Sequence, residues 1–334
     1  MKKKSFLSSL VQQPEFILIV LILVICVYLS NYNEGFMTAT NWKSMSRGFT
    51  IEAFVLIGMT FLLITGVFDI SVASVMAFAG YVFTSFAKDG MSLFLAFLLA
   101  VLVGGLIGLI NGLIVTKLEV NPFITTLATM TIVRSLVLAI SQGNPVRMVD
   151  QAFTSISSST IGGVPIIFIV FVILAVVIDI MLRKVRWFRQ LYFIGGNQVS
   201  AELTGINVDK IRVILYITIG ALAAVAGCLS SSRLGGSIPT AYAGLEMQLL
   251  LACVIGGCSL NGGSGTMLGA VLGLAFLSLL DNGMVMMGID IYWFDGILGV
   301  FLIAVVLINT FSASSVERQQ RKAREQGRHL PAQG

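Results

Sequence analysis

The chain has few of the residues on which most enzyme chemistry depends. Only one of its 334 residues is a histidine, His329, and it lies close to the C-terminal end. This argues against a histidine-based metal site and against a catalytic triad with an imidazole base. None of the cysteines Cys26, Cys228, Cys253 and Cys258 belongs to a CxxC pair, and all lie in or beside apolar runs. We therefore interpret them as small core residues.

Charge is also scarce. Charged residues make up 11% of the chain and hydrophobic residues 57%, whereas about 25% of the residues of a soluble domain are charged. The mean hydropathy of +0.95 indicates a polytopic membrane protein. A P-loop is absent as well, because the glycines of Gly262–Thr266 are followed by no lysine that would bind phosphate. ATP hydrolysis is therefore expected on a separate subunit.

What the chain does have is a series of long apolar segments. About 20 residues of helix cross a bilayer, and backbone that faces lipid must be helical. We predict an all-α polytopic fold with about ten transmembrane helices. The segments lie at about residues 15–31, 50–66, 71–86, 92–116, 123–141, 164–182, 211–230, 245–257, 265–280 and 294–311. The third and the eighth are short for full spans, which suggests tilted or partly re-entrant helices.

The distribution of basic residues predicts the orientation. With both termini in the cytoplasm, 15 of the 21 basic residues lie on the cytoplasmic side, as the positive-inside rule favours. Segments two to five and seven to ten then form two inverted four-helix units, a recurring transporter design. Residues 1–312 would form the transmembrane domain, and residues 313–334 a basic cytoplasmic tail near anionic lipid.

The polar loop at about residues 183–212 stands out from this apolar background. Its sequence fits a turn, a short amphipathic helix over 198–203 and a second turn. Three glycines permit the tight backbone on either side of that helix: Gly195, Gly196 and Gly205. The helix would present Ala201, Leu203 and Ile206 to a groove of a soluble partner. The alternative is an interfacial helix that lies on the membrane surface.

Two polar positions at segment ends have both a functional and a structural interpretation. Asp69 lies at a break between apolar segments, where a charge is costly unless it has a role. It would line the transport pathway, or Asp69 or Ser71 would cap the following helix, which is the interpretation we favour. Asn121 and Pro122 fit an N-cap and the first residue of a helix.

Arg134 lies inside the fifth segment, about a third of the way from its outer end. A cation at that depth needs a partner or water. Asp69 and Asp281 are the candidate counter-ions, and we favour an internal ion pair over direct contact with a ligand. The glycine-rich stretch 256–265 forms a loop that contacts a partner, gates the pathway or turns tightly between packed helices.

Four stretches closely resemble the permease subunits of bacterial ribose-type ABC importers, a family that also serves galactose, xylose, rhamnose and autoinducer-2. They are GVFDISVAS at Gly66–Ser74, NPFITTLATMTIVRSL at Asn121–Leu136, GGNQVSAELTGINV at Gly195–Val208 and GLEMQLLLACVIGGCSLNGGSGTMLG at Gly244–Gly269. The resemblance implies a ten-helix permease that dimerises with itself or a paralogue. It also implies a tandem cytoplasmic ABC ATPase that holds ATP and Mg²⁺, and a periplasmic substrate-binding protein.

By the same resemblance, the polar loop is the coupling loop that docks in a cleft of the ATPase. The residues that match its motif are Gly195, Gly196, Asn197, Ala201, Gly205 and Ile206. The residues expected along the substrate pathway are Asp69, Ser71, Ser74, Asn121, Arg134 and Glu246. No catalytic or metal-binding residue is expected.

We therefore expect a multi-pass permease of the bacterial inner membrane that translocates a monosaccharide or similar solute, contacts lipid and binds no nucleic acid. The alternative is an ion-coupled secondary transporter of a small polar solute, which would need intramembrane carboxylates or unwound ion sites. A membrane enzyme is disfavoured, because no nucleophile and base or metal constellation is present.

Overall fold

The computed structural model describes residues 14–290, 292–294, 296–301 and 303. It divides the chain into two compact units, of which the first ends at Ile289 and the second begins at Asp290. The described residues of the second unit between 292 and 303 are helical. They include only part of the tenth predicted segment, 294–311, and the predicted tail 313–334 lies outside the described residues.

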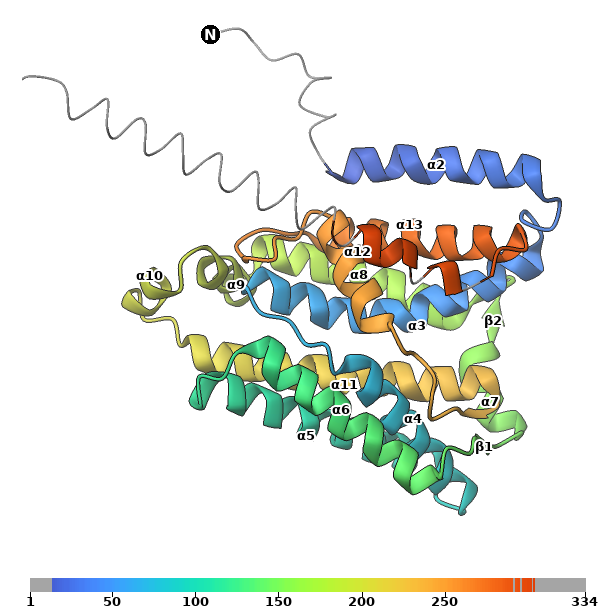
Figure 1. Cartoon of the computed structure of the whole chain (residues 1–334), viewed down its shortest axis with the longest axis horizontal. Coiled ribbons are helices and arrows are strands. Elements are labelled where there is room, and N and C mark those ends of the chain that lie inside the picture. The colour runs from blue at the N-terminus through green and yellow to red at the C-terminus, as the bar shows by residue number, and fades with distance from the viewer. Residues whose placement is uncertain (1–13, 291, 295, 302, 304–334) are drawn as a thin grey trace, which may run out of the picture. The chain divides into compact units, whose positions relative to one another are not determined.

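The first unit is a bundle of helices, as the apolar segments predict (Figure 1). Its long or apolar helices are α2 (Pro14–Tyr32), α3 (Ala39–Ile64), α4 (Val72–Lys88), α5 (Leu93–Lys117), α6 (Pro122–Ser141), α8 (Ile166–Lys184), α11 (Val208–Leu234), α12 (Leu245–Ile255) and α13 (Met267–Met286). Three short helices lie in the connections: α7 (Gln151–Ser158), α9 (Arg186–Gly196) and α10 (Gln198–Leu203).

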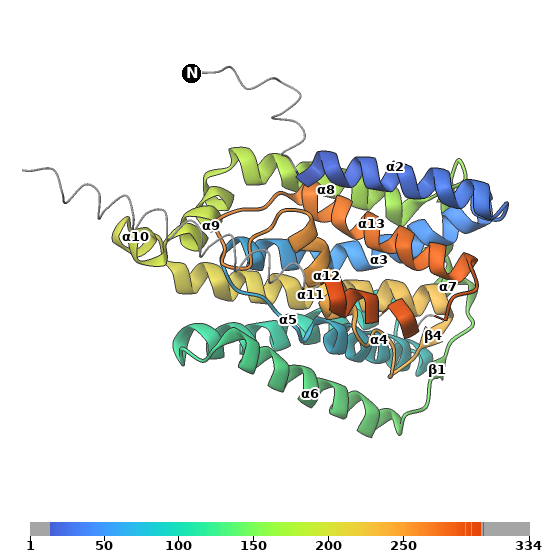
Figure 2. The same cartoon turned by 45° about the horizontal axis from the view of Figure 1, so that its top comes forward.

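Four two-residue strands, β1 (Val146–Arg147), β2 (Thr160–Ile161), β3 (Val164–Pro165) and β4 (Gly236–Ser237), complete the described elements. The pairs β1–β4 and β2–β3 are antiparallel. We name the two ends of the bundle after their short helices. The α10 end carries α9 and α10, and the α7 end carries α7, β1 and β4 (Figures 1 and 2).

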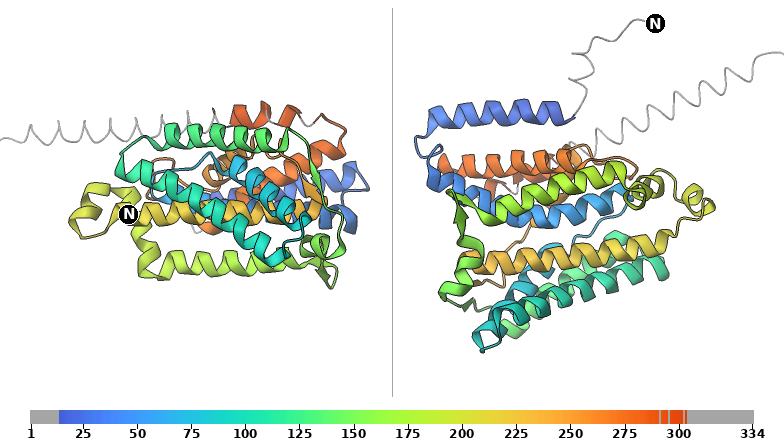
Figure 3. Two further views of the ribbon diagram at one scale, coloured as in Figure 1. Left: turned by 90° about the horizontal axis from the view of Figure 1, so that it is seen from below. Right: turned by 180° about the vertical axis from the view of Figure 1, so that it is seen from behind.

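Helices α3 and α11 form the centre of the bundle. Both are buried along most of their lengths, whereas α2, α5, α6 and α8 expose most of their apolar surface, as helices that face lipid do. Helix α11 packs against α5, α4 and α3, and α13 packs against α3, α8 and α2. The views from front and back accordingly show α2 beyond α13 on one side of the centre and α5 on the other (Figures 1 and 3).

Small residues allow α5 and α11 to pack closely. A Cβ atom added at Gly108 would lie 2.1 Å from the carbonyl oxygen of Tyr216. One added at Gly104 would lie 2.4 Å from the carbonyl oxygen of Gly220. Backbones that touch in this way are typical of membrane helices, where dispersion contacts and not the hydrophobic effect hold helices together.

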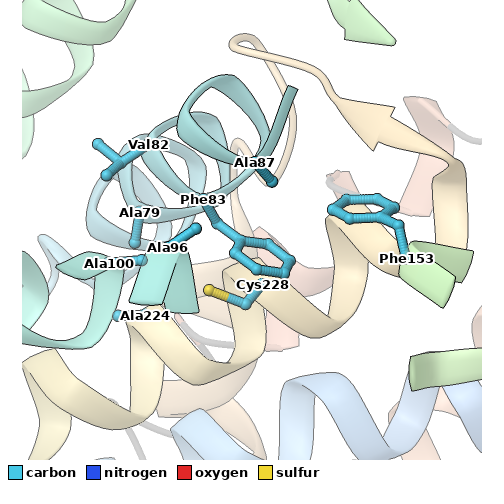
Figure 4. Close-up of a cluster of buried hydrophobic side chains, with 9 residues drawn as sticks. All are labelled: Ala79, Val82, Phe83, Ala87, Ala96, Ala100, Phe153, Ala224 and Cys228. Carbon is cyan, nitrogen blue, oxygen red and sulfur yellow. The ribbon is translucent and has the colours of Figure 1, made fainter. Parts of the chain in front are cut away.

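An aromatic cluster fixes the short helix α7 to the bundle. The rings of Phe83 on α4 and Phe153 on α7 stack with centroids 5.2 Å apart and planes inclined by 21°. Cys228 of α11 packs in the same buried cluster (Figure 4). The Ser232 hydroxyl donates to the carbonyl of Phe153 at 2.7 Å and anchors the helix further. Cys228, Cys253 and Cys258 are buried, and Cys26 is half-buried.

The two segments predicted to be short are short. Among the described residues, seven helices are long and apolar enough to cross a membrane, whereas α4 has 17 residues and α12 only 11. After α3 the chain runs back into the bundle without helical structure before α4 begins, and it does the same between β4 and α12 (Figures 1 and 2). We call α4 and α12 the interrupted helices. The inverted four-helix units remain a prediction, because the tenth segment is only partly described.

Candidate functional site

The polar loop is folded into α9 and α10, which project at one end of the bundle (Figure 2). The side chain of Asn197 begins α10 by accepting a hydrogen bond from the amide of Ser200 at 2.9 Å. Asparagine is among the best residues for this position, because its oxygen satisfies an amide that has no partner inside the helix. The predicted turn and short helix are therefore present.

Gly205 ends α10. Its φ of +84° lies in the left-handed region that favours glycine. Its amide donates to the carbonyl of Glu202 at 2.9 Å, and the amide of Ile206 donates to that of Ala201 at 3.1 Å. This pair of bonds is a Schellman motif, which satisfies the last carbonyls of the helix. Gly205 thus has a defined backbone role in the polar loop.

The exposed face of α10 differs from the face that the sequence suggested. Leu203 is 84% exposed, as expected, but Ala201 is 3% exposed and Ile206 is half-buried. The second exposed apolar side chain is Val199, at 66%. Residues four apart lie on one face of a helix, so Val199 and Leu203 form the apolar face that α10 presents. Ala201 points inward and seats the helix on the bundle.

Helix α9 packs directly on backbone. A Cβ atom added at Gly195 would lie 2.0 Å from the carbonyl oxygen of Ile64 and 2.3 Å from the amide nitrogen of Gly263. Those two groups bond to each other at 2.9 Å. The Tyr192 hydroxyl donates to the carbonyl of Gly265 at 2.9 Å, and burial raises the pKa of Tyr192 to about 12. The phenol therefore remains a donor at neutral pH.

The connection between α3 and α4 reaches the same place. A Cβ atom added at Gly262 would lie 2.8 Å from the Cα of Gly195 and 2.8 Å from the amide nitrogen of Gly66. Nearby, the guanidinium of Arg212 on α11 donates to the carbonyl of Thr65 at 3.0 Å. We call this meeting point, formed by Gly66, Gly195, Gly262 and Gly263, the glycine junction. The backbone of Gly196 also lies close to Gly263, but a Cβ added at Gly196 itself would point away from the junction and meet nothing within 4 Å.

A polar cavity of about 780 Å³ lies at the α10 end, between α10, the start of α11 and the turn that joins α5 to α6. Its charged lining residues include Glu119, Glu202 and Arg212. Asn121 also lines it and caps α6 by accepting from the amide of Phe123 at 2.9 Å. The predicted N-cap is therefore correct, and the same residue faces an open cavity.

Asp69 is the centre of a buried hydrogen-bond network. The residue is 2% exposed, and its Oδ1 accepts from the amide of Ser71 at 2.8 Å and from its hydroxyl at 2.6 Å. Oδ2 accepts from the side-chain amide of Asn111 at 3.2 Å. The hydroxyl of Thr129 donates to the Asn111 oxygen at 2.6 Å. Ser71 is the N-cap residue of α4, but its hydroxyl bonds to Asp69 and not to a helix amide. The network ties α4, α5 and α6 together.

Arg134 makes contacts that the sequence did not suggest. Its Nη1 donates to the carbonyl of Pro239 at 2.7 Å and to that of Ala241 at 2.9 Å. Asp69, one of the expected counter-ions, is instead bonded to Ser71 and Asn111. The guanidinium therefore holds the chain between β4 and α12 against α6.

Three of the predicted pathway residues meet in one small pocket. Ser74 of α4, Arg134 of α6 and Glu246 of α12 line a space of about 240 Å³ where the two interrupted helices approach α6. We call this space the interrupted-helix pocket. The structure thus sorts the six pathway candidates: Asp69 and Ser71 lie in a closed network, Asn121 at the cavity of the α10 end, and the other three in this pocket.

The sequence analysis did not identify two polar residues that the structure shows in hydrogen bonds. One is Asn111, the partner of Asp69 and the only side-chain amide in the apolar run 92–116. The other is Glu52 in the second segment, whose Oε2 accepts from the side-chain amide of Gln248 at 3.3 Å. A polar residue in an apolar run was the available signal in both cases. Within the described part of the chain, no group of three or more His, Cys, Asp or Glu side chains is placed to hold a metal ion.

Comparison with known proteins identifies the type of chain. Residues 44–306 match the family described as branched-chain amino acid transport system / permease component. The ribose import permease protein of Bacillus subtilis (strain 168) is 33% identical over 288 residues, which cover 86% of this chain and 89% of the relative. The ribose import permease protein of Escherichia coli (strain K12) is 31% identical over 87% of this chain and 92% of its own length.

An L-arabinose transport system permease protein of Escherichia coli (strain K12) is 32% identical over 294 residues, which cover 88% of this chain and 90% of the relative. No solved structure matches the chain. The family match over residues 44–306 includes the polar loop, the glycine junction and the interrupted-helix pocket.

Proposed function

This chain belongs to the family described as branched-chain amino acid transport system / permease component, and we propose that it translocates a monosaccharide as the membrane subunit of an ABC importer. It is a multi-pass membrane permease and not an enzyme. The observation that carries the proposal is similarity over almost the full length to permeases named for ribose and L-arabinose. ATP and Mg²⁺ would act on the partner ATPase.

The proposed substrate class rests on the sugars for which these relatives are named, because the family description names amino acids instead. A pentose is neutral, whereas an amino acid carries both a carboxylate and an ammonium group. We therefore propose a neutral sugar. Uptake of radiolabelled ribose, arabinose and leucine by the complete transporter would decide the class, and leucine uptake alone would contradict it.

The ATPase would dock at the α10 end. That end carries α10 with its exposed Val199 and Leu203, and basic residues such as Arg183 and Lys210 lie at the neighbouring helix ends. A short helix with an apolar face fits a groove in a soluble partner. Basic loops favour the cytoplasmic side, where an ATPase would be available. Both termini would then be cytoplasmic, and a substrate-binding protein would dock at the α7 end.

The predicted coupling residues would act by shaping the loop rather than by touching the ATPase. Asn197 starts α10, Gly205 and Ile206 end it, and Ala201 seats it. Gly195 packs against backbone atoms of the glycine junction, whereas the space next to the Cα of Gly196, where a side chain would lie, is open. Closure of an ATPase pair that grips α10 would move α9 as a rigid piece.

The pathway would connect the interrupted-helix pocket with the cavity at the α10 end. Ser74, Arg134 and Glu246 line the pocket, and Asn121 lines the cavity. We propose that Asp69 and Ser71 hold α4 in place beside this route through their bonds to Asn111. The functional complex would contain a second permease copy or a paralogue, with lipid around it.

Co-purification from native membranes in mild detergent, followed by mass spectrometry, tests the docking. Leu203→Asp should lose the ATPase, because it places a charge on the exposed face of α10. Val149→Asp is the matched control, since Val149 is 89% exposed but lies between β1 and α7 at the other end. Retention of the ATPase by Leu203→Asp would contradict docking through this face.

A second variant changes the backbone of the same loop. Gly205→Pro cannot adopt the φ of +84° and lacks the amide that donates to Glu202. It should remove the ATPase while the bundle remains folded. An intact wild-type chain that binds no ATPase and takes up solute only with an ion gradient would instead support a secondary transporter.

A further inference from the structure

The interrupted-helix pocket is lined by several polar side chains, and one of them has no hydrogen-bond partner among the described residues. The pocket opens at the surface of the bundle, near the first residues of α4 and α12 and beside α6, where Thr131, Ser135 and Ala243 are exposed. Its volume is about 240 Å³. The polar or small residues that line it are Ser74, Thr131, Arg134, Ser135, Gly244 and Glu246.

Ser74 is the first sign of a missing partner. Ser74 is 1% exposed, and its Oγ has no hydrogen-bond partner among the described residues. Burying a hydroxyl without a hydrogen bond costs free energy, so most buried hydroxyls have a partner. Ser74 is among the residues that line the pocket, so a ligand there that reached this hydroxyl would supply the partner.

Arg134 supplies further donors. The bonds to the carbonyls of Pro239 and Ala241 engage Nη1, and together they fix the plane of the guanidinium. An arginine side chain has five N–H donors in a rigid fork, and the described residues show no hydrogen bond from Nε or Nη2. The arginine is thus held in position by backbone while part of its donor set stays available at the pocket.

Glu246 lines the same pocket and adds an acceptor of opposite charge. A pocket with one guanidinium and one carboxylate has no net formal charge, which disfavours a ligand that carries a net charge. Adjacent hydroxyl groups suit it, because each hydroxyl both donates and accepts. One would donate to the carboxylate while another accepts from the guanidinium or from Ser74.

The size of the pocket limits the ligand further. Because water takes up about 30 Å³ per molecule in the liquid, the pocket has room for about eight waters. A single sugar ring is of that size, and a disaccharide is not. We propose that the interrupted-helix pocket binds one neutral monosaccharide through Ser74, Arg134 and Glu246 on its way across the membrane. This inference rests on the proposed function and gives the permease a solute site of its own.

A purely structural role for these residues makes a different prediction for Ser74. Removing a buried hydroxyl that has no partner should leave stability unchanged or raise it slightly. If the hydroxyl binds sugar, Ser74→Ala should weaken sugar binding by about three- to tenfold, which is the usual effect of one lost hydrogen bond. The two roles are therefore separable in one variant.

Ser85→Ala is the matched control. Ser85 lies on the same helix, its Oγ is also buried without a partner among the described residues, and it is not among the residues that line the pocket. Glu246→Gln is the second test variant, because it keeps the shape of the side chain and removes its charge. All variants are made in the full chain and purified with the ATPase in lipid nanodiscs.

The first readout is equilibrium binding of radiolabelled ribose and arabinose without the substrate-binding protein, with sucrose as a competitor. The second is the KM for uptake by the complete transporter in proteoliposomes, and the third is Tm. We expect weaker binding and a higher KM for Ser74→Ala and Glu246→Gln, wild-type values for Ser85→Ala, and no competition by sucrose.

Three outcomes would overturn the inference. Equal binding and KM in Ser74→Ala and wild type would remove the site while uptake, and with it the proposed function, persists. Strong competition by sucrose would contradict the size limit. A wild-type complex that transports neither sugar would overturn the proposed function together with the site. The first two outcomes contradict only the site, because the wild-type complex still takes up sugar. The third is recognised by the absence of wild-type uptake.

Discussion

Two neighbouring glycines provide a sharp test of how α9 is coupled to the bundle. Gly195 and Gly196 are both in the last turn of α9, and their substitution by alanine is the same chemical change. At Gly196 the added Cβ meets nothing within 4 Å. At Gly195 it would lie 2.0 Å from the carbonyl oxygen of Ile64 and 2.3 Å from the amide nitrogen of Gly263. Only one of the two variants therefore disturbs the glycine junction.

The two alanine substitutions are expected to change the stability in opposite directions. Alanine in place of glycine in a helix contributes up to about 1 kcal/mol of stability, and Gly196→Ala should show only this gain, reduced at the helix end. The Cβ of Gly195→Ala would lie much closer to the carbonyl oxygen of Ile64 than the 3.4 Å at which ordinary van der Waals contact begins. Because the neighbouring atoms belong to backbone and cannot change rotamer, α9 itself must move away. Overpacking of this kind costs about 1–3 kcal/mol. A net difference of about 2 kcal/mol corresponds to about 30-fold in the equilibrium between a seated and a displaced α9.

The assay is the amount of ATP hydrolysed per solute transported by the complete transporter in proteoliposomes, together with Tm. We expect Gly196→Ala to match wild type in both. Gly195→Ala should have a lower Tm and hydrolyse more ATP per solute, because a displaced α9 no longer transmits the motion of α10 to the glycine junction. Equal coupling in the two variants would refute the argument that this backbone contact transmits the motion.

The packing of α5 on α11 predicts that Gly108→Ala lowers the Tm and the yield of folded protein, because its Cβ would lie 2.1 Å from the carbonyl oxygen of Tyr216. Gly105→Ala is its control, since the nearest atom is 3.8 Å away, and a similar loss in both would contradict the assignment. For Asp69, the Tm should fall in the order wild type, Asp69→Asn, Asp69→Ala, because alanine removes both acceptors and leaves the Asn111 amide without this partner. If Asp69→Asn transports within a few-fold of wild type, Asp69 is structural; a complete loss of transport at an unchanged Tm would contradict that role.

The sequence predicts what depends on local pattern. The lengths of the apolar runs were enough to find the membrane helices and to identify α4 and α12 as short. Asn121 was recognised as a cap because its partner, the amide of Phe123, is two residues away. Capping and span length depend on residues close together in the chain, so they can be recognised before the fold is known.

Long-range contacts could not be predicted in the same way. Gly195 and Gly196 cannot be distinguished from the sequence. The fold shows that a Cβ atom at Gly195 would collide with Gly263, whereas one at Gly196 would not. Arg134 was assigned charged partners because a charge suggests a counter-ion, but its bonds go to two carbonyls of a connection that folds back beside α6. The amphipathic pattern of the loop predicts Ala201 on the docking face, whereas its burial depends on how α10 sits on the bundle.

The position of the glycine junction explains why a movement of α9, such as the proposed docking of an ATPase would cause, would reach the interrupted helices. The junction joins α9 to the connection before α4 through Gly66 and to the connection after α12 through Gly262 and Gly263. Side chains at such a contact would yield by changing rotamer. Glycines have none, and close-packed backbone transmits strain. A shift of α9 must therefore displace both connections together. Because α4 and α12 also line the interrupted-helix pocket, that displacement would change the pocket at the point where we place the sugar.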